Sequence, residues 1–357
     1  MMLKSRYNHA MEDPNAKTRD TYHPIKMKPE MVDDLLTHEM DKLSFKDRND
    51  IYEEIHGVAS LAVKETPELI DQSLYKLSLE IERIKDKYTA YKEATKCYNP
   101  YLHGVEIRLR FLRCDLFNVP KAAERMMKYL DLTQYLYGDY ALTRPIQLRD
   151  LGKQEMEMLR AGDTQPMPFR DRSGRRLMVA MNNMGLQYPL EVRVCTTSVS
   201  YMEMTLFTFF LLGFFFNFSF LLLCVFQTGM GCFIAFQIRV STYLFWAMGE
   251  DEESQRKGLI GIICWPSSKE AVTPKHFSIV YSPKEIPRHI HLSNRMFDCV
   301  PVRIAGMHMC LPDEPIFHMM RTGLALSMGV NRSRLKTHIG EPPLVYSERG
   351  SRIEFCF

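Results

Sequence analysis

The chain has 357 residues, of which 46% are hydrophobic and 25% charged, so it can bury the core of one large domain or of two modest ones. Its formal net charge of +3 is small for this length and gives no bulk electrostatic support for a nucleic-acid partner. Nine cysteines without a CxxC pair, and a polar N-terminus unsuited to a secretory signal, favour a reducing compartment. We therefore expect the protein on the cytoplasmic side.

The first 160 residues carry the patterns of helices. Residues 1–28 are polar, contain two prolines and show no hydrophobic period, which is typical of a disordered leader. Region 29–160 is predicted to be helical. In its clearest helix, apolar residues recur every three or four positions from Ile70 to Tyr91. A helix packed on its own domain is favoured over a coiled coil, because this stripe covers only about three heptads. The helices expected here span 45–57, 67–96, 105–114 and 120–137.

Beyond residue 165 the pattern changes to short apolar runs bounded by Gly, Pro or charged residues. Runs of this kind suit strands that are buried on both faces of a sheet. A turn at Arg170–Gly174 precedes the first run, and helical segments at 242–257 and 313–328 stand around the later ones. This alternation predicts an α/β domain behind the helical region. The expected strands are 176–181, 258–264 and 302–309.

Four segments, in this order, resemble one known family. They are LRFLRCDLFNVPKAAERMMKYL at 109–130, DRSGRRLMV at 171–179, ESQRKGLIGI at 253–262, and PVRIAGMHM from Pro301 continuing through EPIFH to NRSRLKTHIG at 331–340. Together they resemble the CRAL-TRIO family, whose members bind and transfer phosphatidylinositol, retinaldehyde or tocopherol.

The resemblance covers about 105–340 and implies an organisation for the chain. An N-terminal helical module, about 105–137, would precede a CRAL-TRIO-type α/β/α sandwich with an apolar lipid cavity at 166–340. A short tail at 341–357 would follow, since the family's usual C-terminal Leu-Pro…Gly-Gly segment is absent.

The function implied is non-enzymatic binding of a hydrophobic lipid, and its transfer between membranes, by a protein peripheral to the membrane surface. A lid helix at about 315–328 would close the cavity. Its stripe of Ile316, Met320, Leu324 and Met328 suits a pliable apolar surface, although an ordinary core helix with a methionine stripe would show the same spacing. The expected cavity lining is Met178, Val179, Met181, Ile260, Ile262, Ile304, Met307, Ile316, Phe317, Met320 and Leu324.

Basic side chains suggest where a headgroup or a membrane surface would lie. By resemblance these are Arg303, Arg332 and Arg334. Members that transfer phosphatidylinositol carry Glu after the proline, where this chain has Val302, and Lys in place of Arg334, so phosphoinositide specificity is not implied. A second basic run, at 170–176, would either meet anionic lipid headgroups or form a solvated turn.

Two other kinds of site can be constructed from histidines. His276, His289 and His291 could be cast as a metal site, with the last two alternating as on a strand, but no Cys or carboxylate stands at ligand spacing. His308 and His318, with Asp313, could serve a hydrolase, but no GxSxG, HExxH or phosphate-binding glycine loop is present. We therefore predict no catalytic residue, no metal and no cofactor, and keep the hydrolase as an alternative.

One apolar run, residues 204–238, does not fit this organisation. Its 35 residues contain no Asp, Glu, Lys, Arg or His, and 205–226 is long enough to cross a membrane. A single span would place strand 176–181 and the later strands on opposite sides of the bilayer. Three interpretations follow. The run is non-coding sequence, since Val194 would join Arg239 smoothly; it is a re-entrant hairpin; or it is a real span that anchors an integral membrane protein with a helical cytosolic N-terminal region.

Overall fold

The computed structural model describes most of the two regions expected from the sequence. The described residues are 30–96, 98–162, 164–181, 235–264, 285–313, 315–340, 344–346 and 353–355. The leader at 1–28 and the candidate span at 205–226 lie outside them, as does most of the tail. Within the described residues, no helix combines the length and apolar character that a membrane crossing requires.

The N-terminal region is helical, as predicted. Helix α4 starts where Thr66 caps its first turn, accepting a hydrogen bond from the Leu69 N–H at 3.2 Å, with Pro67 at the first helical position. The predicted helix 105–114 is confirmed as α7, and the one at 120–137 as α8. The helices are α2 (Glu30–Asp41), α3 (Phe45–Ile55), α4 (Pro67–Ile84), α5 (Thr89–Ala94), α6 (Pro100–His103), α7 (Val105–Cys114), α8 (Val119–Tyr137) and α9 (Lys153–Ala161), with 3-10 turns η1 (Lys85–Lys87), η2 (Asp139–Leu142) and η3 (Leu148–Asp150).

The single helix expected over 67–96 is wrong, because the chain breaks at η1 and restarts as α5. The restart is fixed by α8, where the Asp131 carboxylate accepts a hydrogen bond from the Ala90 N–H at 3.1 Å. This contact satisfies one of the N–H groups that a helix start leaves without a partner. A distant residue therefore sets a boundary that the local apolar stripe runs across.

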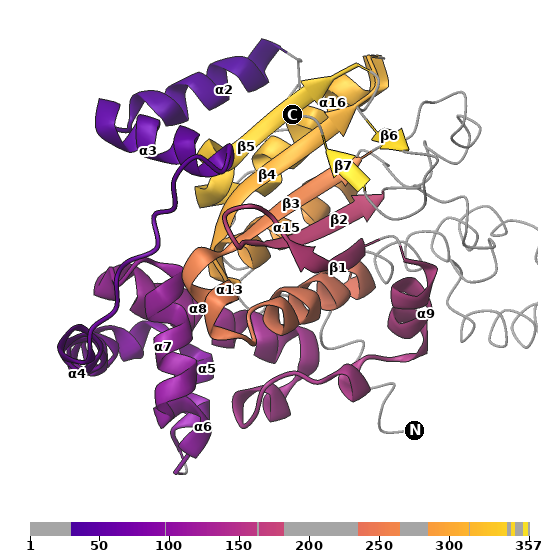
Figure 1. Cartoon of the computed structure of the whole chain (residues 1–357). Helices are drawn as coiled ribbons and strands as arrows, with labels where there is room; N and C mark the ends of the chain where they lie inside the picture. The colour runs from indigo at the N-terminus through magenta and orange to yellow at the C-terminus, as the bar shows by residue number, and fades with distance from the viewer. Residues whose placement is uncertain are drawn as a thin grey trace, which may run out of the picture.

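Five strands form one mixed sheet in the order β1-β2-β3-β4-β5 (Figure 1). Strands β2 to β5 run parallel, while β1 and β2 pair antiparallel through the predicted turn at Arg170–Gly174. All three predicted strands are confirmed, and β1 and β5 are additional. The strands are β1 (Thr164–Arg170), β2 (Arg176–Met181), β3 (Leu259–Cys264), β4 (Ile304–Leu311) and β5 (Leu335–Ile339), with a separate two-stranded ribbon of β6 (Leu344–Tyr346) and β7 (Ile353–Phe355).

Helices connect the parallel strands. A helix over 235–248 and the short α13 (Glu252–Lys257) replace the single helix expected at 242–257, while α16 (Pro315–Ser327) confirms the helix expected near 315–328 and leads to η4 (Gly329–Arg334). His289 and His291, whose spacing resembles that of a strand, both lie in α15 (Glu285–Cys299). Two alternating histidines are too short a pattern to show the helical stripe that follows them. Its buried members are Leu292, Met296 and Cys299.

The sheet separates two apolar clusters. We call the side covered by α15 and α16 the first face, and the opposite side the second face. In Figure 1, α15 and α16 lie behind the sheet, so the second face is turned to the viewer. The core of the first face joins strand residues such as Met307 and Met309 to helical ones such as Phe245, Phe297 and Phe317. The second-face cluster consists of Leu177, Val179, Ile260, Ile262, Cys264, Ala305 and Cys310.

The helical module is joined to the sheet domain through the helix at 235–248. The Arg110 guanidinium lies 3.9 Å from the centre of the Trp246 ring and donates hydrogen bonds to the Trp246 and Gly249 carbonyls. On the same indole, Tyr129 of α8 stacks with a centroid distance of 5.6 Å. The last residues of the apolar run, Phe236 and Ile238, are buried in this helix.

Helices α2 and α3 form an arm beside the edge strand β5 (Figure 1). Helix α2 contacts α16, and α3 contacts β4 on the second face. The approach of α3 depends on Gly306, since a Cβ there would lie 3.1 Å from Ile260 Cδ1 and 3.5 Å from the Ile55 Cα. The arm thus crosses from one face of the sheet to the other.

Candidate functional site

The expected cavity lining is divided by the sheet. Successive side chains of a strand point to opposite faces, so an uninterrupted apolar strand supplies both. The side chains of Met181, Ile316 and Met320 lie outside the described residues. The first face receives Met178, Ile304, Met307, Phe317 and Leu324. The second face receives Val179, Ile260 and Ile262. The eleven residues are therefore not brought together around one cavity.

The second face carries a compact apolar cluster made by strands. Its central side chain, Ile262, is 1% exposed, and Met167 of β1 packs against the cluster from the edge of the sheet. Among the described residues, no helix contributes a side chain to this cluster. All seven members of the cluster are buried, so the second face is a compact apolar surface made by strand side chains.

Three histidines gather where α3 meets the second face. The His308 Nδ1 of β4 lies 3.0 Å from the His338 Nε2 of β5, and the His56 ring centre lies 6.4 Å from that of His308. Burial and the neighbouring His338 ring lower the pKa of His308 to about 4, and burial together with Lys336 lowers the pKa of His56 and His338. At neutral pH these rings are therefore uncharged.

The positions of the histidines can be compared with the metal site and the hydrolase site that the sequence suggested as alternatives. Within the described part of the chain, no group of three or more His, Cys, Asp or Glu is arranged to hold a metal ion. Of the suggested hydrolase residues, His308 is buried beside His338, Asp313 is exposed beyond the end of β4, and the side chain of His318 lies outside the described residues. His56 and His338 could not be predicted from the sequence, because no local motif marks them.

The expected headgroup arginines bind carboxylates of the arm. Glu54 of α3 is fully buried and accepts from Arg303 at 2.5 Å and from Arg334 at 2.6 Å. Arg332 pairs with Glu39 of α2 at 3.2 Å and donates to the Ala325 carbonyl. Burial alone would raise the pKa of Glu54, but the two guanidinium groups outweigh it and leave that pKa below its ordinary value. In this structure the arginines hold α2 and α3 against the sheet domain.

The second basic run is also largely paired within the chain. Arg170 and Arg176 both bind Asp251 at the start of α13, at 2.6 and 2.8 Å. Arg175 binds Asp171 at 2.6 Å and donates to the Glu54 carbonyl. The turn is thus tied to α13 and α3, and of the four arginines only Arg172 has an exposed side chain.

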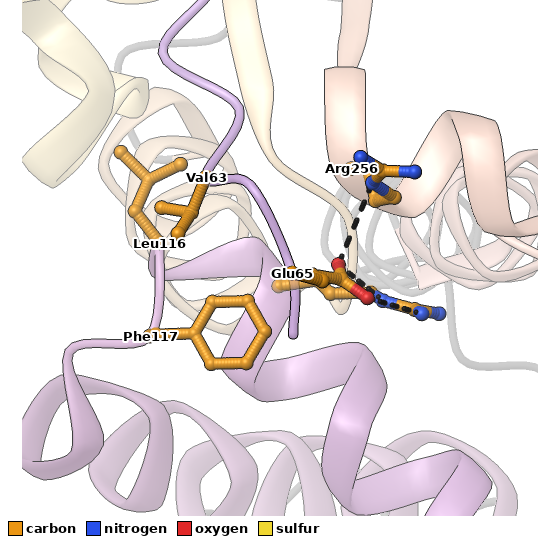
Figure 2. A pocket seen from close by; sticks show the side chains of 6 residues that line it. Val63, Glu65, Leu116, Phe117 and Arg256 are labelled. Atoms are coloured by element: carbon orange, nitrogen blue, oxygen red, sulfur yellow. Dashed lines mark hydrogen bonds and ion pairs between the residues drawn. The ribbon is translucent and has the colours of Figure 1, made fainter. Parts of the chain in front are cut away.

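A small hollow lies where the segment before α4 meets the α7–α8 turn and α13 (Figure 2). Its space of about 160 Å³ includes open solvent and has no room for an enclosed water molecule, whereas small-molecule sites begin at roughly 300 Å³. Its carboxylate, Glu65, is bound by Arg113 at 2.7 Å and lies 3.6 Å from Arg256. Figure 2 shows Leu116 and Phe117 on the opposite side. Its size and its internally paired charges favour a packing defect over a ligand site.

Comparison with protein-family models and with curated proteins found no match to this chain.

Proposed function

We propose that the chain is a non-enzymatic lipid-binding protein whose ligand lies against the second face of the sheet. The observation that carries the proposal is the apolar cluster of that face, to which no described helix contributes a side chain. Of the lining residues expected from the sequence, the proposal keeps Val179, Ile260 and Ile262 and adds Leu177. The likeness of four segments to the CRAL-TRIO family supports a lipid ligand, transfer between membranes and a peripheral position on the cytoplasmic side.

The proposed ligand is chiefly hydrocarbon. Arg303 and Arg334 are engaged by Glu54, so an anionic headgroup would have to compete with a buried carboxylate. Each buried methylene contributes about 0.8 kcal/mol, so ten of them supply about 8 kcal/mol before the cost of association. An acyl or isoprenoid chain therefore has enough apolar surface to bind without a charged contact.

The lid role expected for α16 is not needed at this site. Phe317 and Ala325 of α16 are buried in the core of the first face, as is Met328 just beyond the helix, and α16 packs on α15. A ligand on the second face is separated from α16 by the sheet. The alternative of an ordinary core helix suits these contacts.

Mass spectrometry of bound lipid tests the proposal. Organic extracts of the purified full chain should contain one lipid class in near-stoichiometric amount. Ile262→Trp, which fills the second face, should lose most of it. Ile339→Trp, at a position that is 47% exposed on β5, is the matched control and should retain it. Equal lipid in both variants, or none above a mock purification, would overturn the proposal.

A second candidate, membrane anchoring, rests on the apolar run at 204–238. Its 35 uncharged residues are the observation that favours it. A chain anchored through 205–226 should stay with membranes through an alkaline carbonate wash, whereas a peripheral protein should be released. Sequencing of the expressed message tests the non-coding interpretation, because a transcript with codons 195–238 would remove it.

A further inference from the structure

Two cysteines stand opposite each other at the end of the sheet. Cys264 is the last residue of β3, and its partner in the register of β4 is Cys310. Both thiols belong to the second-face cluster, and they are 3% and 4% exposed. Neither is in a disulfide. The parallel pairing therefore puts two thiols side by side on one face.

The spacing of neighbouring strands suits a bond between these sulfurs. Adjacent strands lie about 4.7–4.9 Å apart, and disulfides join Cα atoms about 4.4–6.8 Å apart. Cys264 and Cys310 are register partners on adjacent strands and lie in the same cluster, so their thiols are neighbours on one face. The usual separation of paired strands therefore falls within the range that a disulfide spans.

We infer that Cys264 and Cys310 form a redox-active dithiol, which a hydroperoxide converts into a disulfide across β3 and β4. The Cys310 sulfur attacks one peroxide oxygen, the O–O bond breaks, and Cys310 sulfenic acid and water form. The Cys264 sulfur then attacks the Cys310 sulfur, the S–O bond breaks, and the hydroxyl group leaves as a second water with the Cys264 proton. Two thiols lose two electrons, and hydrogen peroxide is reduced to two waters.

The order of attack follows from the opposite effects that the neighbouring thiols have on each other. The interaction with Cys264 lowers the pKa of Cys310, while the same interaction and burial raise the pKa of Cys264. Because the thiolate is the reactive form, Cys310 reacts first and Cys264 resolves the intermediate.

Two other buried thiols provide an internal comparison. Burial raises the pKa of Cys114 and of Cys299 to about 12. Cys299 ends α15 in the core of the first face, and Cys114 donates its S–H to the Val300 carbonyl. Both should stay reduced under conditions that oxidise the β3–β4 pair.

The test uses the full chain treated with hydrogen peroxide, followed by alkylation of remaining thiols, digestion and mass spectrometry. We expect a peptide pair joined through Cys264 and Cys310, with the loss of two hydrogens. Its formation should be at least about tenfold faster than oxidation of Cys299, the factor that one pKa unit gives in thiolate fraction. This rate comparison within the unaltered chain requires no variant to fold.

Variants then test the roles. Cys264→Ser should leave Cys310 as a sulfenic acid that dimedone traps, and Cys299→Ser should form the disulfide as the parent does. Oxidation of Cys299 before the pair, or a linked peptide that appears only in denatured protein, would overturn the inference.

Lipid content offers a separate readout, which rests on the proposed function. Cys264 and Cys310 belong to the second-face cluster, so a disulfide between them changes the apolar surface at one end of that face, and the oxidised chain should retain less lipid. Unchanged lipid content with the disulfide formed would refute this coupling while leaving the redox pair established.

Discussion

Apolar side chains line both faces of the sheet, but the two faces are completed in different ways. On the first face, side chains from α8, α15 and α16 interleave with those of the strands in one continuous core. On the second face, the described cluster comes from strands alone. The same strands supply both, through the alternation of their side chains. An apolar strand therefore predicts a buried sheet, but it does not indicate which face of that sheet is covered by helices of the same chain.

The charged groups differ between the faces as well. At one end of the second face, α3 packs against His308 and His338, with Arg175 and Lys336 close by. The fully buried Glu54 links this helix to two arginines of the sheet domain. The second face thus combines an apolar centre with a basic corner, in which Glu54 pairs with Arg303 and Arg334 and Asp171 pairs with Arg175.

Removal of that carboxylate should have the largest effect on the arm. Glu54→Gln would leave Arg303 and Arg334 buried without a counter-charge, which costs about 3–5 kcal/mol for a broken buried pair. Urea unfolding should show this loss, and hydrogen exchange should show earlier opening of α3. Glu53→Gln, at the neighbouring partly exposed position, is the control and should change the free energy of unfolding by less than about 0.5 kcal/mol. Equal effects would mean that Glu54 does not hold the arm.

Truncation on each face distinguishes a core from a ligand surface. Met307→Ala on the first face should cost about 2–5 kcal/mol in the free energy of unfolding, whether or not lipid is present. In delipidated protein, Ile262→Ala should lower the free energy of unfolding by less than Met307→Ala does. In lipid-bound protein the cost of Ile262→Ala should rise, because the substitution also removes contacts with the ligand. The two losses in delipidated protein are the decisive numbers. If they are the same, the second face is an ordinary core.

The histidine cluster predicts a dependence on pH. The pKa of His308 is about 4 in the folded protein, below the ordinary value of 6.5, so the unfolded chain binds more protons between these values. The contribution of His308 to the free energy of unfolding should therefore be fully present above pH 6.5. It should be lost as the pH drops toward 4, which lowers the free energy of unfolding by about 3 kcal/mol. His56 and His338, whose pKa values are also lowered, add in the same direction.

Chemical unfolding at a series of pH values measures this slope. His308→Asn should flatten the curve between pH 6.5 and 4. His38→Asn on α2, where the imidazole is exposed, is the control and should leave it steep. An unchanged slope in His308→Asn would contradict the assignment.

Much of the fold could be predicted because its signals are local. The three expected strands and helices α7 and α8 follow from apolar periods bounded by Gly, Pro or charge, and they are confirmed within two residues at each end. The edge strand β1 was missed because Pro166 and Pro168 argue against a strand, although an edge tolerates them. The break after α4 was missed because Asp131, far along the chain, caps the next helix.

The candidate site could be predicted only in part because its geometry is not local. Val179, Ile260 and Ile262 were named, but nothing in their spacing separates them from Met178 and Ile304 on the other face. That Glu54 would occupy Arg303 and Arg334 depends on a contact between residues some 250 positions apart, for which a single sequence carries no signal. The pairing of Cys264 with Cys310 likewise required the register of β3 and β4.

Photolabelling with a lipid that carries a diazirine in its acyl chain tests the central claim most directly. After irradiation of the full chain and fragmentation of its peptides, the account predicts adducts on Leu177, Val179, Ile260 and Ile262, the strand residues of the second face. Adducts on Met307, Met309 and Phe317 would place the ligand on the first face and contradict it.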